Sequence, residues 1–163
     1  MYKRQLKERF DQFEEGVQVV IKLLSEERAS FDGVHFQLRD AWCEPKPVQR
    51  PHPPIAIGGN GEKRTLKIVA RYAQHWNSTL GDVEAWRHKR SVLEQHCADA
   101  RRDPAEIELS VNVRLPAGTD PQTLQPAIEA WTAAGVDICI IGLAVPHSPA
   151  VLAPLAEALA PLV

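Results

Sequence analysis

Apolar residues recur at helical spacing at the start of the chain. From about Leu6 to Ser25 they lie three or four positions apart, which predicts an amphipathic helix. In residues 29–38, Asp32-Gly33 stands between short runs in which apolar and polar residues alternate, which indicates a β-hairpin. Prolines from Pro45 to Pro54 then predict an extended connector. We interpret it as a loop within one domain, because each flank alone is too small to form a core.

Beyond the connector, strand-like and helix-like segments alternate. An apolar strand runs into a glycine-rich turn at Gly58, and a helix follows through Ala73. The next pair is a short strand at 75–78 and a helix at about 82–101. Apolar and polar residues alternate over 107–115, which predicts a strand with one buried face. A helix should begin at Asp120-Pro121 and end at Gly135.

The last strand and helix are the most apolar. Residues 137–143 carry almost only apolar side chains, which is typical of a parallel strand covered on both faces. Ser148-Pro149 should begin the final helix, and its buried stripe should comprise Leu152, Leu155, Ala156 and Leu159.

This order predicts an α/β fold with a parallel sheet, because short loops between alternating strands and helices favour right-handed βαβ units. A closed (β/α)8 TIM barrel takes eight strands and about 250 residues. The 163 residues and four βα units expected here correspond to a half-barrel. We therefore expect a single domain over 1–163, with the helix, hairpin and connector in 1–52 and the four βα units in 53–163.

Composition narrows the function classes. The net charge is -2 and the basic residues are scattered, which argues against nucleic acid as the main partner. Apolar runs are too short to span a membrane, and the amino terminus lacks the apolar core of a signal peptide. Three widely spaced cysteines form neither a disulfide framework nor a zinc motif. We expect a cytoplasmic protein without a metal site.

The glycine turn, defined here as residues 58–63 (Gly-Gly-Asn-Gly-Glu-Lys), carries the strongest functional signal. Glycines permit positive φ and a close approach of the backbone to a ligand. The first amides of the following helix lack internal partners and favour an anion. Lys63 adds a positive charge. This pattern indicates phosphate binding, although a tight strand-to-helix connection without a ligand would also need glycines.

The run PHPPIAIGGNGEKRTLKIVARYAQHWN resembles the carboxy-terminal half of the luciferase-like monooxygenases, most closely the branch that depends on the deazaflavin coenzyme F420. The hairpin FDGVHFQL and the lead-in PKPVQRPHPP stand in the family's order. The resemblance implies a (β/α)8 barrel that binds F420, or FMN as the alternative, at its carboxy-terminal mouth. It also implies that the cofactor ring carries the hydride chemistry.

The resemblance implies a set of cofactor-binding residues around the glycine turn and the next strand. They are Gly58, Gly59, Asn60, Gly61, Glu62, Lys63, Thr65, Trp76 and Asn77. A tryptophan at the position of Trp76 is more often a core residue than a ring stacker, and Lys63 could simply pair with Glu62. Asn112 and Arg114 could be polar packing or substrate contacts. Catalytic residues stay unassigned, because the family's first half holds most of them.

The function predicted is that of an oxidoreductase, by hydride transfer or monooxygenation of a small-molecule substrate, in a truncated or partial form. The alternative is a non-catalytic half-barrel that binds a phosphate-bearing ligand or pairs with another chain. A family member without any ligand is a third reading. Because an open sheet leaves two edge strands unpaired, we also expect a homo-oligomer or pairing with a missing amino-terminal half-barrel.

Overall fold

A parallel sheet lies at the centre of the molecule. The computed structural model describes residues 2–145 and 148–162. The sheet contains β3 (Ala56–Gly58), β4 (His75–Ser78), β5 (Glu108–Leu115) and β6 (Ile138–Leu143), side by side in chain order. Every neighbouring pair is parallel. The predicted parallel α/β fold is confirmed.

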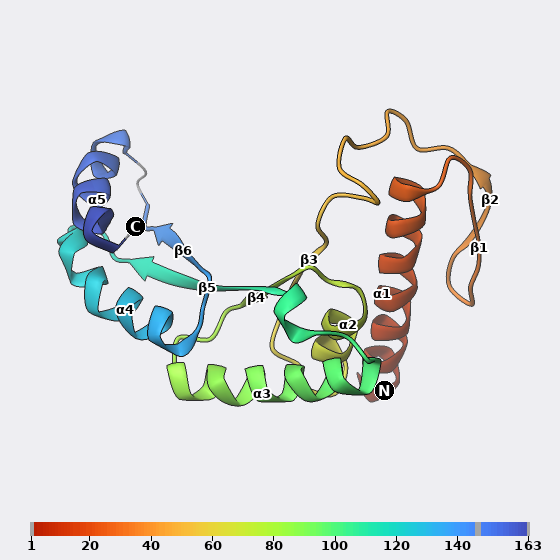
Figure 1. Cartoon of the computed structure of the whole chain (residues 1–163), viewed down its shortest axis with the longest axis horizontal. Coiled ribbons are helices and arrows are strands. Elements are labelled where there is room, and N and C mark those ends of the chain that lie inside the picture. The colour runs from red at the N-terminus through yellow and green to blue at the C-terminus, as the bar shows by residue number, and fades with distance from the viewer. Residues whose placement is uncertain (1, 146–147, 163) are drawn as a thin grey trace.

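Helices follow the strands, as the sequence predicts. They are α2 (Thr65–Tyr72), α3 (Val83–Ala100), α4 (Gln125–Ala134) and α5 (Leu152–Leu159). Short 3-10 turns accompany them: η1 (Pro104–Glu106), η2 (Pro121–Leu124), η3 (Pro149–Val151) and η4 (Ala160–Leu162). Figure 1 shows α2, α3 and α4 gathered on one side of the strands. The helix expected from Asp120 begins as η2, and Gly135 ends α4 with φ of 90°.

Three tryptophans join the sheet to the helices. Trp76 of β4 stacks on Trp86 of α3, with ring centroids 6.1 Å apart, and Trp131 of α4 meets Trp86 edge-on at 6.0 Å. Trp76 and Trp86 have no exposed surface. The Trp86 Nε1 group has no hydrogen-bond partner among the described residues. Trp86 therefore stabilises the fold by burial and ring packing rather than through a hydrogen bond of its indole NH.

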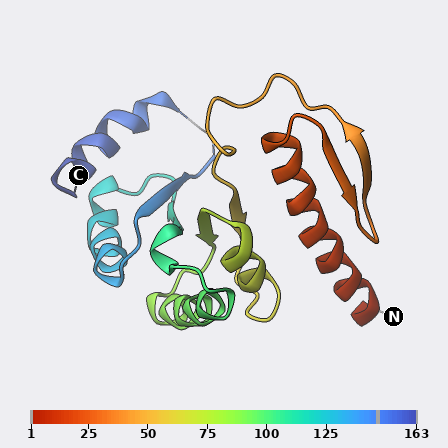
Figure 2. The ribbon, with the colours of Figure 1, turned by 45° about the vertical axis from the view of Figure 1, so that its right-hand side comes forward.

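The amino-terminal segment forms a separate hairpin beside a long helix. Figure 2 shows β1 (Ala29–Asp32) and β2 (Gln37–Ala41) lying along α1 (Tyr2–Ser25). The Glu15 carboxylate accepts hydrogen bonds from the amides of Val34, His35 and Phe36 at 2.8–3.1 Å. Desolvation opposes the shift, but these hydrogen bonds hold the pKa of Glu15 below 4.5. One side chain thus fixes the hairpin to the helix.

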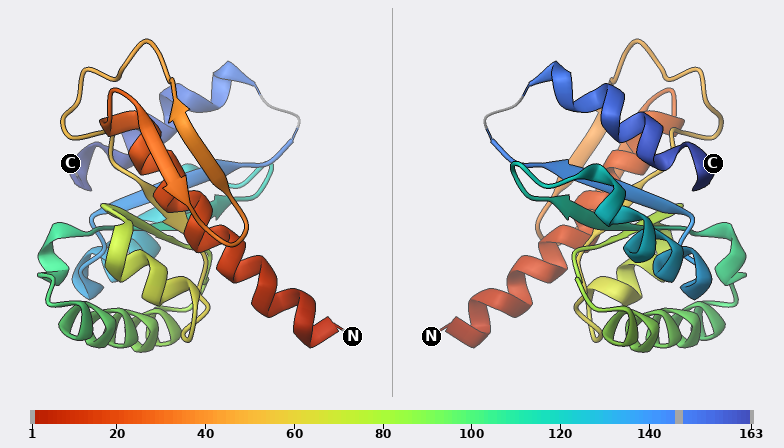
Figure 3. Two further views of the ribbon diagram at one scale, coloured as in Figure 1. Left: turned by 90° about the vertical axis from the view of Figure 1, so that its right-hand side faces the viewer. Right: turned by 90° about the vertical axis from the view of Figure 1, so that its left-hand side faces the viewer.

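Ion pairs join α1 to α2 and its approach. Arg64 contacts Asp11 at 2.8 Å, and Arg71 contacts Glu14 at 2.7 Å. Such half-exposed pairs are worth about 0–1 kcal/mol each, so they orient α1 more than they stabilise it. The two views of Figure 3 show α1 extending beyond the layer of α2 and α3.

Two expectations of burial were wrong. Residues of β6 were expected to be covered on both faces, yet Ile138 and Ile140 are 37% and 43% exposed. Their side chains point away from the helices, and no other layer of the described chain covers that face. In α5, Leu155 and Leu159 of the predicted stripe pack against the core, but Leu152 is 56% exposed and Ala156 is exposed as well, while Ala158 is the buried residue.

Within residues 2–145 and 148–162, no helix combines the length and apolar character needed to cross a membrane.

Candidate functional site

The glycine turn follows β3 and leads to α2, as predicted. Gly59 has φ of 121°, and a Cβ there would lie 3.2 Å from Thr65 Cγ2. A Cβ on Gly61 would lie 2.8 Å from Thr65 Oγ1. The turn therefore closes on Thr65 with space for glycine alone. Gly59, Gly61 and Thr65, all predicted from sequence, are brought together here.

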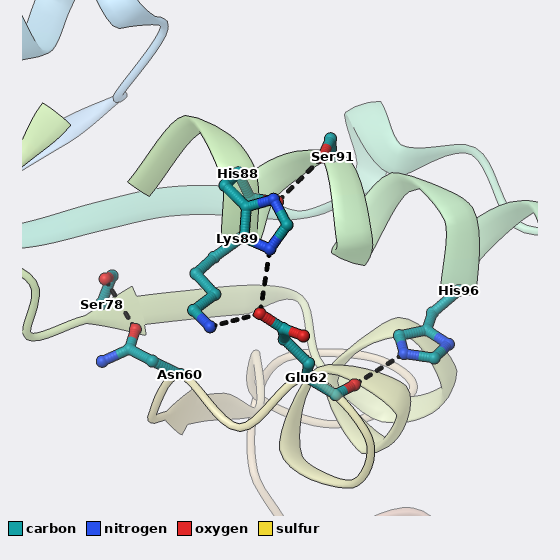
Figure 4. Close-up of polar contacts among 7 residues, drawn as sticks. All are labelled: Asn60, Glu62, Ser78, His88, Lys89, Ser91 and His96. Carbon is teal, nitrogen blue, oxygen red and sulfur yellow. Dashed lines mark hydrogen bonds and ion pairs between the residues drawn. The ribbon is translucent and has the colours of Figure 1, made fainter. Parts of the chain in front are cut away.

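Asn60 fastens the turn to the end of β4. Its Oδ1 accepts from Ser78 Oγ at 2.7 Å, as Figure 4 shows. Its Nδ2 donates to Thr79 Oγ1 at 3.1 Å. The Gly59 amide donates to the Asn77 carbonyl at 3.0 Å. The Asn60 side chain is thereby committed to positioning the turn.

Trp76 supports the turn from the helix side. Its Nε1 donates to the Gly59 carbonyl at 2.8 Å. Because its ring is fully buried against Trp86, it does not reach the surface that a ligand would contact. Trp76 is therefore a core residue, as the alternative interpretation of the sequence had it.

Glu62 points away from the turn, toward α3. Its Oε1 accepts from Lys89 Nζ and lies 3.0 Å from His88 Nε2, while its carbonyl accepts from His96 Nε2 at 2.7 Å (Figure 4). The hydrogen bond from Lys89, followed by that from His88, lowers the pKa of Glu62 below 4.5. The negative charge of the turn is thus neutralised by α3.

The backbone of the turn offers free donors. Among the described residues, the amides of positions 60–65 donate to no protein oxygen, whereas Gly59 and Leu66 on either side are bonded. Lys63 is exposed, and its ammonium group pairs with no carboxylate of the described chain. Gly58 is exposed as well. These groups together could bind an anion such as a phosphate.

A second polar feature, the polar ladder, lies on the sheet face away from the helices. It consists of His75, Asn77, Ser110 and Asn112, which project from β4 and β5. Ser110 Oγ lies 2.6 Å from His75 Nε2 and accepts from Asn77 Nδ2 at 2.8 Å. Asn112 Nδ2 donates to Asn77 Oδ1 at 3.3 Å. Because Ser110 Oγ accepts the hydrogen bond from Asn77 Nδ2, its own hydroxyl proton is free to be donated to His75 Nε2.

Sequence reasoning found Asn77 and Asn112 but missed Ser110 and the contact with His75. The alternation in β5 places Ser110 and Asn112 on the same face, which the sequence does show. Its register against β4, which pairs Asn77 with Ser110, comes only from the three-dimensional structure. Asn112 and Arg114 are exposed on this face.

The remaining candidates offer no reactive centre in the described part of the chain. No three His, Cys, Asp or Glu side chains there cluster as metal ligands. Burial raises the pKa of the Cys97 and Cys139 thiols, so both are protonated at neutral pH. The turn and the polar ladder are the features that could serve a ligand.

Comparison with known proteins gives a consistent result. The model of a family described as luciferase-like monooxygenase matches residues 1–160. The F420-dependent glucose-6-phosphate dehydrogenase of Microbacterium testaceum is 25% identical over 126 residues, which cover 76% of this chain and 37% of that protein. The FMNH2-dependent dimethylsulfone monooxygenase of Pseudomonas putida is 32% identical over 75 residues, which cover 46% of this chain and 20% of that protein.

Among solved structures, the coenzyme F420-dependent tetrahydromethanopterin reductase of Methanopyrus kandleri superposes with a TM-score of 0.79 at 12% identity. The match covers 94% of this chain and 63% of that one, and it bears on the fold. The chain thus spans well under half the length of the curated relatives it matches. Four βα units of a TIM-barrel-type fold are consistent with this coverage.

Proposed function

The chain belongs to the luciferase-like monooxygenase family, and from this premise we propose that it acts as an oxidoreductase that binds a deazaflavin or flavin cofactor at the glycine turn. Coenzyme F420 is the first candidate and FMN the alternative, since relatives with each dependence match this chain. The proposed reaction is hydride transfer or monooxygenation of a small organic molecule.

One observation supports this proposal most: the amides at positions 60–65 have no acceptor among the described residues, and they lie beside Gly59 and Gly61, which leave no room for side chains. Both cofactors carry a phosphate at the end of a ribityl chain. A phosphate would accept several of these amide donors, and the exposed Lys63 would add a charge. The turn and its surroundings therefore fit the tail of either cofactor.

When bound, the cofactor ring would supply the hydride chemistry. The residues of this chain would bind and orient it. Gly58 and Gly59 let the backbone approach the ligand, and Trp76 holds the Gly59 carbonyl in place. Asn77 and Asn112 present amides whose orientation is fixed through Ser110. We propose that this face lies toward the ring and the substrate.

The proposal also includes the location and the assembly of the protein. We propose a cytoplasmic protein whose half-barrel works as part of a larger assembly, either a homo-oligomer or a pairing with another half-barrel.

Titration with F420 and with FMN, followed by fluorescence, tests the proposal. We expect saturable binding by the wild-type chain and a loss of at least tenfold in affinity for Gly59→Val, because a branched side chain at φ of 121° would distort the turn. Gly81→Val is the matched control, since a Cβ at Gly81 meets no atom within 4 Å. Absence of binding of both cofactors at high micromolar concentration would contradict the proposal.

A second candidate is a non-catalytic half-barrel that binds a phosphate-bearing ligand. The four-stranded sheet favours it, because half a barrel offers half the wall around a ring. The ring spectrum separates the two functions. A cofactor held by its tail alone would keep the absorbance of the free ring and be displaced by inorganic phosphate, whereas an enclosed ring would shift its absorbance.

A further inference from the structure

Both edges of the parallel sheet are unpaired in the described chain. β3 pairs with β4 alone and β6 pairs with β5 alone, and the hairpin forms a sheet of its own. An unpaired edge exposes a row of amides and carbonyls that another strand can bind. Two such edges on one sheet, each beside apolar surface, require a physical explanation.

The edge at β3 lies in an apolar groove. The groove has a volume of about 630 Å³ and runs between α1, the hairpin tip and β3. From α1 it receives Phe13 and Val20, which are 40% and 46% exposed, and from the hairpin Phe36, which is 40% exposed. Residues 54–57 form its other wall. Such a slot beside a free strand edge has the form used for strand addition.

The edge at β6 has the matching character. Its sequence, Ile-Cys-Ile-Ile-Gly-Leu, contains no polar or charged side chain. Ile138 and Ile140 expose 37% and 43% of their surface on the face away from the helices. The groove residues likewise include no charged side chain. Contact between these two surfaces would therefore bury no unpaired charge.

We propose that β6 of a second copy enters the α1–β3 groove and pairs in parallel with β3, while β6 of the first copy does the same in return. A twofold axis along the strand direction preserves the direction of every strand, so both junctions are parallel. Four strands from each copy give eight, the number at which a barrel interior is just filled by side chains. The occupant of the groove is thus a second copy of this chain.

This dimer extends the proposed function. It rests on that function in one respect, namely that the closed interior encloses the cofactor ring. Closure turns the exposed face of each sheet inward, so the polar ladders of both copies, Asn112 included, line one interior. Ile138 and Ile140 then lose their contact with water. The wall around a cofactor ring, incomplete in one chain, would be completed by the partner copy.

Sedimentation equilibrium of the purified chain tests the inference. We expect twice the chain mass of 18.1 kDa at tens of micromolar concentration. Val20→Glu in the groove and Ile140→Lys on β6 should each give the monomer mass, because each places a charge in a junction. Both side chains are already 46% and 43% exposed, so the folded monomer tolerates the changes. Val48→Glu, at a 94% exposed connector position, is the control and should leave the dimer intact.

A wild-type mass of one chain at 100 µM, an open series of larger species, or a dimer unaffected by both variants would overturn the inference. Cofactor binding, measured on the same samples, keeps the two proposals apart. A monomer that binds FMN or F420 overturns the dimer alone, whereas a dimer that binds neither overturns the cofactor proposal alone.

Discussion

Gly59 shows how the backbone of the glycine turn limits which amino acid can occupy a position. Its φ of 121° lies where residues with a Cβ are strained, and the Thr65 methyl group lies 3.2 Å from where a Cβ would be. The turn depends equally on its polar contacts, since Asn60 and Glu62 hold it to β4 and α3. Ligand affinity and local stability should therefore respond together to changes here.

Gly59→Ala should lower the free energy of unfolding by roughly 1–3 kcal/mol, the usual range for a residue held in a disfavoured backbone region. Urea denaturation followed by tryptophan fluorescence measures it. Gly81→Ala, where a Cβ meets no neighbour, should change stability by much less. Equal effects of the two substitutions would refute the strained turn.

Glu62 should make stability depend on pH in the acidic range. Because Lys89 and His88 hold its folded pKa below 4.5, its stabilisation is complete above about pH 4.5 and is lost as the pH falls below that value. Glu62→Gln should therefore be less stable than wild type at pH 6, and the difference should shrink toward pH 3. Denaturation midpoints across this range measure it. Glu27→Gln, at an exposed position, is the control and should show no such convergence.

At the scale of elements, the hairpin and α1 form a unit that depends on Glu15. Three consecutive amides at the hairpin tip donate to this one carboxylate. Glu15→Ala should speed hydrogen exchange at Val34, His35 and Phe36, because these amides lose their acceptor. Exchange followed by NMR measures it, with the exposed Glu27→Ala as control. Unchanged protection at the three amides would show that the hairpin holds its shape without Glu15.

The packing of β4, α3 and α4 depends on Trp86. Trp86→Ala should cost about 3–5 kcal/mol, the range for removing a large buried aromatic side chain. Trp86→Phe should cost clearly less, because the indole NH that it removes has no partner among the described residues. Thermal or urea denaturation compares the two variants, and Trp42→Ala, 64% exposed, is the control. Similar losses for Ala and Phe would contradict this account of the cluster.

Elements with strong local signals were predictable. Strand β4 occupies the expected residues 75–78, and α3 begins after its Asp82 cap as the sequence indicates. Burial was less predictable, because it depends on neighbours. The apolar pattern of β6 suits a covered strand, yet one face lacks a covering layer in the described chain. The polar ladder was missed for a similar reason, since the contact of Ser110 with His75 depends on strand register.

At the scale of the whole molecule, the order of the helices and strands agrees with the family assignment. A helix, a hairpin and four βα units follow one another as in the predicted half-barrel, and the family model matches residues 1–160. The treatment of 1–163 as one domain, with a division near residue 52, stays a prediction. Because both edges of the parallel sheet are unpaired among the described residues, association with another chain is favoured, and the proposed assembly and the proposed cofactor site should be tested on the same samples.

The measurement that tests this account most directly is the change in amide NMR shifts on titration with FMN and with F420. The account predicts saturable shifts centred on residues 60–65, with riboflavin, which lacks the phosphate, giving much smaller changes there. The Gly59→Val variant should lose these shifts. Absence of shifts with either cofactor, or saturable shifts confined to residues outside the glycine turn, would contradict the claim that this turn binds the cofactor phosphate.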